Sequence, residues 1–158
     1  MEKAQEEKTL IIMKPDAVQR SLFGEILQRF ERKGLKIIGV KMTKVSDVLL
    51  EEHYSHLTEK PFFNTLKNYM QSSPVVLIAL SGVNAISATR LIVGPTKGYE
   101  ADAGSIRGDY SLSGQSNLVH ASDSPEAAEA EIKRFFAEDE LFDYQKPDYK
   151  LVYSEDHF

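Results

Sequence analysis

The chain has four histidines, and His120 is the one whose sequence neighbours suit a catalytic role. It follows Asn117-Leu118-Val119 at the end of an expected strand and precedes Ala121-Ser122-Asp123 at the start of an expected helix. Helix N-termini favour anions, so a neutral imidazole there can act as a nucleophile or general base toward an anionic group. The other three are expected to be packed or surface residues without metal-like spacing: His53, His56 and His157.

Cationic side chains occupy two further places where an anion could bind. Lys14 follows the short apolar run Thr9 to Met13, which predicts a lysine at the carboxyl end of a buried strand. Arg107-Gly108-Asp109 lies in a glycine-rich stretch of the chain. Arg107 is there either half of a structural ion pair or a planar donor fork for phosphate oxygens.

Two adjacent aromatic residues, Phe62 and Phe63, follow Pro61 at the start of an expected helix. Neighbouring residues cannot share one narrow face of a helix. We therefore expect one of the two rings to be exposed.

Hydrophobic periodicity predicts the elements that must position these residues. Short apolar runs and alternating patterns indicate strands, and apolar spacings of three and four indicate amphipathic helices. The expected strands are Thr9–Met13, Lys36–Val45, Val75–Leu80 and Asn117–His120. The expected helices are Leu22–Lys33, a pair beginning near Ser46 and Pro61, Asn84–Ile92, and a long final helix with Ser124 as its cap and Pro125 in its first turn.

The order of these elements is that of the βαββαβ arrangement of ferredoxin-like folds, once the inserted helix pair is set aside. We predict an α+β fold with a four-stranded antiparallel sheet and helices on one face. Residues Gly94 to Gln115 show neither period. Structureless loops longer than about 12 to 15 residues inside a domain are usually functional or disordered, so this stretch predicts a long binding loop.

Composition narrows the classes of function. A length of 158 residues suits one domain, and we expect residues 1–158 to form it, with an N-terminal tail at 1–8 and a C-terminal extension at 145–158. The absence of cysteine suits a reducing compartment, and the longest apolar run, Val75 to Leu80, is too short to cross a bilayer. The net charge of −5 arises at the two ends of the chain, so no broad basic face is expected. We therefore expect a cytoplasmic protein without membrane or nucleic-acid partners.

Three stretches of the sequence resemble nucleoside diphosphate kinases. They read KPDAVQRSLFGEILQRFERKG, HYSHLTEKPFFNTLKNYMQSSPVV and SIRGDYSLSGQSNLVHASDSPEAAEAEI, and the similarity runs from about Thr9 to Tyr144. The most specific part is the string Asn-x-x-His-x-Ser-Asp-Ser after an Arg-Gly-Asp loop. On these motifs the chain is identified as a member of that family.

The resemblance implies transfer of the γ-phosphate of a nucleoside triphosphate such as ATP to a nucleoside diphosphate, by a ping-pong route that phosphorylates His120. It implies that Glu131 orients the other ring nitrogen of His120 with support from Ser122, and that Lys14 also takes part in catalysis. The residues that it places around the phosphates and ribose are Lys14, Tyr54, Arg90, Thr96, Arg107 and Asn117. It further implies a base stacked on Phe62, Mg²⁺ bound through the nucleotide phosphates without protein ligands, and a homo-hexamer, with a homo-tetramer as the alternative.

Some positions depart from the pattern of that family. Gly114 stands where an apolar residue often closes over the base, and Gly98 and Ala103 stand where prolines are common in the long loop. The alternative interpretation is a non-catalytic nucleotide-binding regulatory module, since a ferredoxin-like fold does not determine function. The joint presence of His120, Glu131 and Lys14 favours the enzyme.

Overall fold

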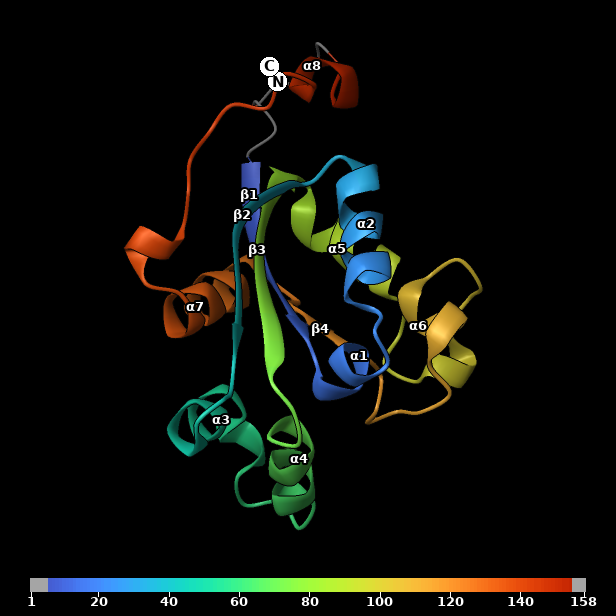
Figure 1. Cartoon of the computed structure of the whole chain (residues 1–158), viewed down its shortest axis with the longest axis vertical. Helices are drawn as coiled ribbons and strands as arrows, with labels where there is room; N and C mark the ends of the chain where they lie inside the picture. Colours follow the sequence, from blue (N-terminus) through green and yellow to red (C-terminus); the bar gives the residue numbers. More distant parts are fainter. Residues whose placement is uncertain (1–5, 155–158) are drawn as a thin grey trace.

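The computed structural model describes residues 6–154, and its centre is a four-stranded sheet (Figure 1). The strand order is β2-β3-β1-β4, and each neighbouring pair is antiparallel. This is the ferredoxin-like arrangement that the sequence predicts. The strands are β1 (Glu6–Met13), β2 (Lys36–Thr43), β3 (Val75–Val83) and β4 (Val119–Ala121).

The sequence predicts helices on one face of this sheet, and the structure adds helices on the second face as well. On one face lie α2 (Phe23–Lys33) and α5 (Ala85–Val93), and on the other lie α3 (Asp47–His53) and α7 (Pro125–Phe135) (Figure 1). Successive residues of β1 are apolar, and alternate residues of a strand face opposite sides. Ile11 and Met13 therefore pack with Phe30 in one core, and Leu10 and Ile12 pack with Phe135 in the other.

Several helix ends follow the predicted local chemistry. The hydroxyls of Ser46 and Ser124 accept hydrogen bonds from backbone amides in the first turns of α3 and α7, and Pro125 opens α7. Helix α2 ends at Gly34, whose φ of 102° is a left-handed conformation that glycine adopts without strain.

The loop from Gly94 to Gln115 contains short helices that the sequence pattern did not predict. They are η2 (Gly98–Glu100) and α6 (Ile106–Tyr110), and the Ser105 hydroxyl caps α6 by accepting from the Gly108 amide. A Cβ atom at Gly108 would lie 1.9 Å from the backbone oxygen of Asp102, so the tight turn depends on a glycine there. Further short elements are α1 (Pro15–Gln19), η1 (Ser55–Leu57) and α4 (Phe63–Met70).

The ends of the chain differ in part from the prediction. Because β1 begins at Glu6, residues 6–8 belong to the sheet and not to a tail. The C-terminal extension follows η3 (Glu138–Glu140) and contains the short helix α8 (Tyr149–Val152). The Tyr153 hydroxyl accepts from the Val83 amide and so attaches the extension to the end of β3. His157 lies outside the described residues.

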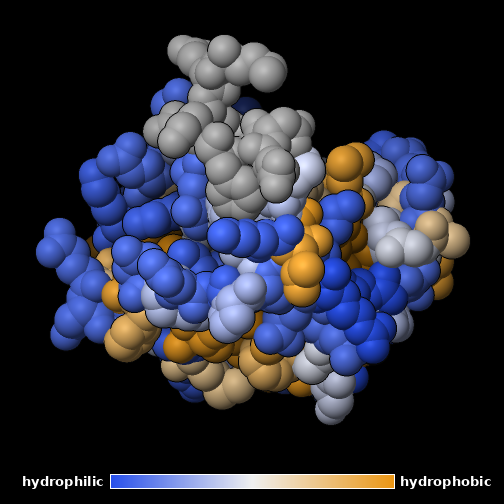
Figure 2. Space-filling model, turned by 90° about the horizontal axis from the view of Figure 1, so that it is seen from above, coloured by the Kyte–Doolittle hydropathy of each residue, from blue (hydrophilic) through white to orange (hydrophobic). Residues whose placement is uncertain are grey.

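The surface on the side of α8 is mostly hydrophilic where it is coloured, with smaller hydrophobic areas between the polar side chains (Figure 2). Within residues 6–154, none of the helices has the length and apolar character needed to cross a membrane.

Candidate active site

A cavity of about 520 Å³ collects most of the residues that the sequence singles out. It opens among the end of β1, the region between α3 and α4, helix α5, the long loop and β4. Eight of the predicted site residues line it: Lys14, Tyr54, Phe62, Arg90, Thr96, Arg107, Asn117 and His120. Residues far apart in sequence therefore meet in one space large enough for a small ligand.

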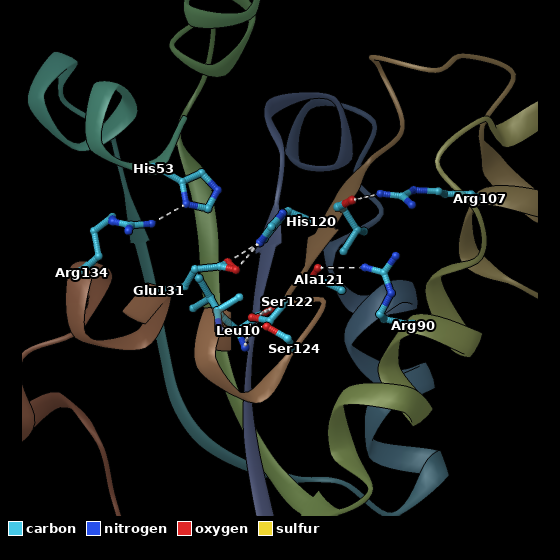
Figure 3. Close-up of polar contacts among 12 residues, drawn as sticks. Leu10, His53, Arg90, Arg107, His120, Ala121, Ser122, Ser124, Glu131 and Arg134 are labelled. Atoms are coloured by element: carbon cyan, nitrogen blue, oxygen red, sulfur yellow. Dashed lines mark hydrogen bonds and ion pairs between the residues drawn. The ribbon is translucent and has the colours of Figure 1, made fainter. Parts of the chain in front are cut away.

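His120 lies on β4 and faces a buried carboxylate on α7. Its Nε2 is 3.1 Å from Oε1 and 2.6 Å from Oε2 of Glu131, whose residue surface is only 6% exposed (Figure 3). A carboxylate is an acceptor, so it favours the ring tautomer with its proton on Nε2. The lone pair then resides on Nδ1, which leaves that nitrogen as the nucleophilic atom.

Ser122 contacts a different group from the one that the resemblance implies. In the part of the chain that the structure describes, its hydroxyl accepts from the Leu10 amide at 3.1 Å and does not bond to Glu131. The Ser122 amide also donates to the Leu10 carbonyl. Ser122 therefore holds the end of β4 to β1, and its influence on His120 is through the backbone.

Lys14 and Asn117 form a buried polar network at the bottom of the cavity. Lys14 Nζ donates to Asn117 Oδ1 at 2.7 Å, while Asn117 Nδ2 donates to the carbonyls of Thr96 and Gly114 at 2.9 and 3.0 Å. Burial, and to a smaller extent the charge of Arg107, lower the pKa of Lys14 to about 8. An anion bound here would restore the stability of the charged ammonium.

The two arginines of the cavity differ in how firmly they are held. Arg107 is buried and donates to the carbonyls of Asn117, Gly94 and Val119, so three of its five N–H groups are used by the backbone. Arg90 is exposed and has one long contact, 3.4 Å to the Ala121 carbonyl. Of the two predicted roles of Arg107, the ion pair with Asp109 was wrong, because Asp109 pairs with Arg29 at 2.6 Å.

The aromatic pair separates as expected. Phe63 is 8% exposed and packs into the interior, whereas Phe62 is 49% exposed and lines the cavity. Gly114 also lines the cavity and has open space, since the nearest heavy atom to an added Cβ would be 3.9 Å away on Lys97. Tyr54 lies deeper, and burial with the negative charge of Glu131 raises its pKa to about 12, so it remains a neutral phenol.

The backbone just before His120 adopts a strained conformation, and hydrogen bonds from neighbouring residues stabilise it. Leu118 has a φ of 72°, which is uncommon for a residue with a side chain. The Asp16 carboxylate accepts from the Leu118 amide at 3.1 Å and from the Tyr69 hydroxyl, and the Lys14 amide donates to the Leu118 carbonyl at 2.8 Å. Sequence reasoning did not single out Asp16, because its partners lie far away along the chain.

His53 is a second residue that sequence reasoning missed. Its ring centroid lies 4.9 Å from that of His120. We expected an ordinary packed or surface histidine and did not predict this contact. Ligand atoms of His53, His120 and Glu131 lie within 4.8 Å of one another. This donor set is rich in imidazole and does not suit Mg²⁺, which prefers oxygen ligands.

Comparison with known proteins gives a consistent result. The family model described as nucleoside diphosphate kinase matches residues 7–141. A nucleoside diphosphate kinase of Parabacteroides distasonis is 53% identical over 96% of this chain and 99% of its own, and one of Methanobrevibacter smithii is 49% identical over 93% and 98%. The solved structure of a Halobacterium salinarum nucleoside diphosphate kinase in complex with CDP superposes with a TM-score of 0.91, at 40% identity over 94% of this chain and 99% of that one. Since the match extends from β1 to the end of η3 and includes the whole cavity, this chain belongs to the nucleoside diphosphate kinase family.

Proposed function

We propose that the protein transfers the γ-phosphate of a nucleoside triphosphate, such as ATP, to a nucleoside diphosphate through a phosphohistidine at His120. The observation that carries this proposal is the pairing of His120 Nε2 with buried Glu131, beside a cavity lined by cationic side chains. The ring is held with its nucleophilic nitrogen free and its protonated nitrogen on a carboxylate. Such an arrangement activates a histidine nucleophile.

In the first half-reaction His120 Nδ1 attacks the γ-phosphorus. The Nδ1–P bond forms as the bridging P–O bond breaks, and the electron pair of that bond leaves with the nucleoside diphosphate. Glu131 stabilises the positive charge that the ring acquires, because its carboxylate stays hydrogen-bonded to the Nε2 proton. In the second half-reaction a β-phosphate oxygen of the acceptor attacks the same phosphorus, and the electron pair of the Nδ1–P bond returns to the ring.

Side chains, and not a glycine-rich phosphate loop, would hold the phosphates. Lys14, Arg90 and Arg107 supply positive charge, and two N–H groups of Arg107 remain after its backbone bonds. Thr96 and Asn117 supply polar groups beside them, and Tyr54 supplies a neutral hydroxyl. Mg²⁺ bound through the nucleotide phosphates would neutralise charge on their oxygens. Among the described residues, Asp123 places a carboxylate in the cavity wall.

Phe62 would bind the base by stacking. Its exposed ring is a flat surface at the cavity, and every base has a face that can stack on it. Since stacking reads no hydrogen-bonding pattern, we propose that purine and pyrimidine nucleotides are both substrates.

We further propose that the protein is a homo-hexamer, with a tetramer as the alternative. The strand β2 lies at an edge of the sheet and exposes two apolar side chains, Val40 at 46% and Met42 at 62%. Exposed apolar side chains on an edge strand favour association with another chain. The cytoplasm remains our prediction for its location, because a cysteine-free composition suits a reducing compartment.

Initial-rate kinetics test the proposed reaction. With ATP and a pyrimidine diphosphate both varied, reciprocal plots are expected to be parallel, because the first product leaves before the second substrate binds. His120→Ala should abolish the reaction, and the control His56→Ala should not, since His56 is an exposed imidazole outside the cavity. Intersecting plots, or an active His120→Ala variant, would refute the covalent route. A chain that binds nucleotides without turnover would instead support the regulatory module.

A further inference from the structure

His53, at the end of α3, touches the proposed nucleophile without being part of the cavity wall as far as the described residues go. Its ring is nearly perpendicular to that of His120, at 84° with 4.9 Å between centroids. It also packs edge-on against Tyr54 and Phe135, at 4.6 and 5.2 Å. Figure 3 shows His53 and Glu131 on one side of His120, with the arginines of the cavity on the other.

Arg134 on α7 determines which nitrogen of His53 carries a proton. Its Nη1 lies 3.0 Å from His53 Nδ1, and a guanidinium can only donate. Nδ1 must therefore accept, and the neutral ring holds its proton on Nε2. Arg134 is itself held by Glu52, with 3.3 Å between Nε and Oε1.

The same surroundings keep the ring uncharged. Burial, with smaller contributions from the charges of His120 and Arg134, lowers the pKa of His53 to about 3. A neutral ring adds no positive charge beside His120 while His120 becomes cationic during phosphoryl transfer. Like charges at this separation would oppose that step.

The His53–His120–Glu131 cluster could also be considered as a transition-metal site. A metal-bound imidazole normally presents a lone pair to the ion and donates its other N–H to an acceptor. Here the second position of His53 faces a donor, Arg134, in place of an acceptor. The contacts therefore favour an orienting role for His53 over metal binding.

We propose that His53 is a positioning residue for the reaction proposed above: locked by Arg134 as the Nε2–H tautomer, it packs against the His120 imidazole and holds it with Nε2 on Glu131 and Nδ1 toward the nucleotide. Glu131 restrains His120 through one nitrogen, and His53 restrains the ring from a second direction. His53 acts through His120 and does not touch the substrate.

Three variants separate this role from simple packing. His53→Phe keeps an aromatic ring but removes the acceptor, Arg134→Met removes the donor, and Arg134→Lys keeps a donor. We expect the rate constant for His120 phosphorylation by ATP to fall about tenfold in the first two, as for loss of one buried hydrogen bond, with nucleotide affinity unchanged. Arg134→Lys should recover most of the rate, and the control His56→Phe should match the wild type.

Nitrogen-15 NMR of the histidine rings gives a readout that does not depend on activity. The wild type should show His53 as the Nε2–H tautomer, and Arg134→Met should lose this bias. A protonated His53 or the Nδ1–H tautomer in the wild type would overturn the proposal, as would phosphorylation rates within twofold of wild type in both His53→Phe and Arg134→Met. If the wild type is never phosphorylated, the proposed function fails, and that result is distinct from a wrong tautomer.

Discussion

We predict that the buried ammonium of Lys14 makes nucleotide binding sensitive to alkaline pH. Its pKa in the free protein is lowered to about 8, chiefly by burial. A bound phosphate needs the charged form and should return the pKa toward the ordinary 10.5. If it does so fully, linkage predicts nearly constant affinity below about pH 7 and a fall of about 30-fold between pH 7 and pH 9.5.

Calorimetric titration with ADP across this range measures the effect, since the phosphates of ADP are already ionised there. Lys14→Arg should bind with little pH dependence because a guanidinium stays charged, and Lys14→Met should bind weakly at every pH. The free wild type should also gain stability from pH 8 to 10.5, because the unfolded lysine keeps its proton there while the folded one has lost it. The reasoning would be refuted if the affinity of the wild type for ADP changed less than threefold between pH 7 and pH 9.5. An equal fall in the affinity of Lys14→Arg would refute it as well.

Three further predictions concern the base, the nucleophile and the loop. Phe62→Ala should weaken ADP binding by about 1 to 3 kcal/mol through lost stacking, while Gly114→Val should tighten it by filling open space. An unchanged dissociation constant for Phe62→Ala would show that the base does not stack on Phe62. Glu131→Gln should slow His120 phosphorylation about tenfold in rapid-quench experiments, because a neutral amide forms a weaker bond than a carboxylate, and an unchanged rate would contradict this. Gly98→Pro should lower the melting temperature, since it removes the amide hydrogen bond to the Ser113 carbonyl and places Cβ 2.3 Å from the backbone oxygen of Ser111. A raised melting temperature would contradict this and show that the loop rearranges.

Much of the fold follows from patterns within single segments. The continuous aliphatic run after Pro74 predicts a central strand, and β3 is buried at every position. The serine caps and Pro125 likewise act within a few residues. The helices on the second face were missed, although the consecutive apolar residues Leu10 to Met13 already indicate burial on both sides. Helix α6 has only five residues, too few for periodicity to show.

The site was predicted less evenly. His120 and Lys14 stand where strands end, and the resemblance supplied Glu131. The contacts of His53 and Arg107 could not be predicted, because His53 meets Arg134 across 81 positions of sequence and Arg107 bonds to backbone carbonyls that no side-chain pattern encodes.

The measurement that tests the account most directly is the intact mass of the protein after mixing with ATP, at high pH where phosphohistidine survives. We predict one added phosphoryl group per chain, mapped to His120, removed by GDP with formation of GTP, and absent in His120→Ala. An unmodified wild-type chain, or a phosphoryl group on another residue, would contradict the phosphohistidine mechanism.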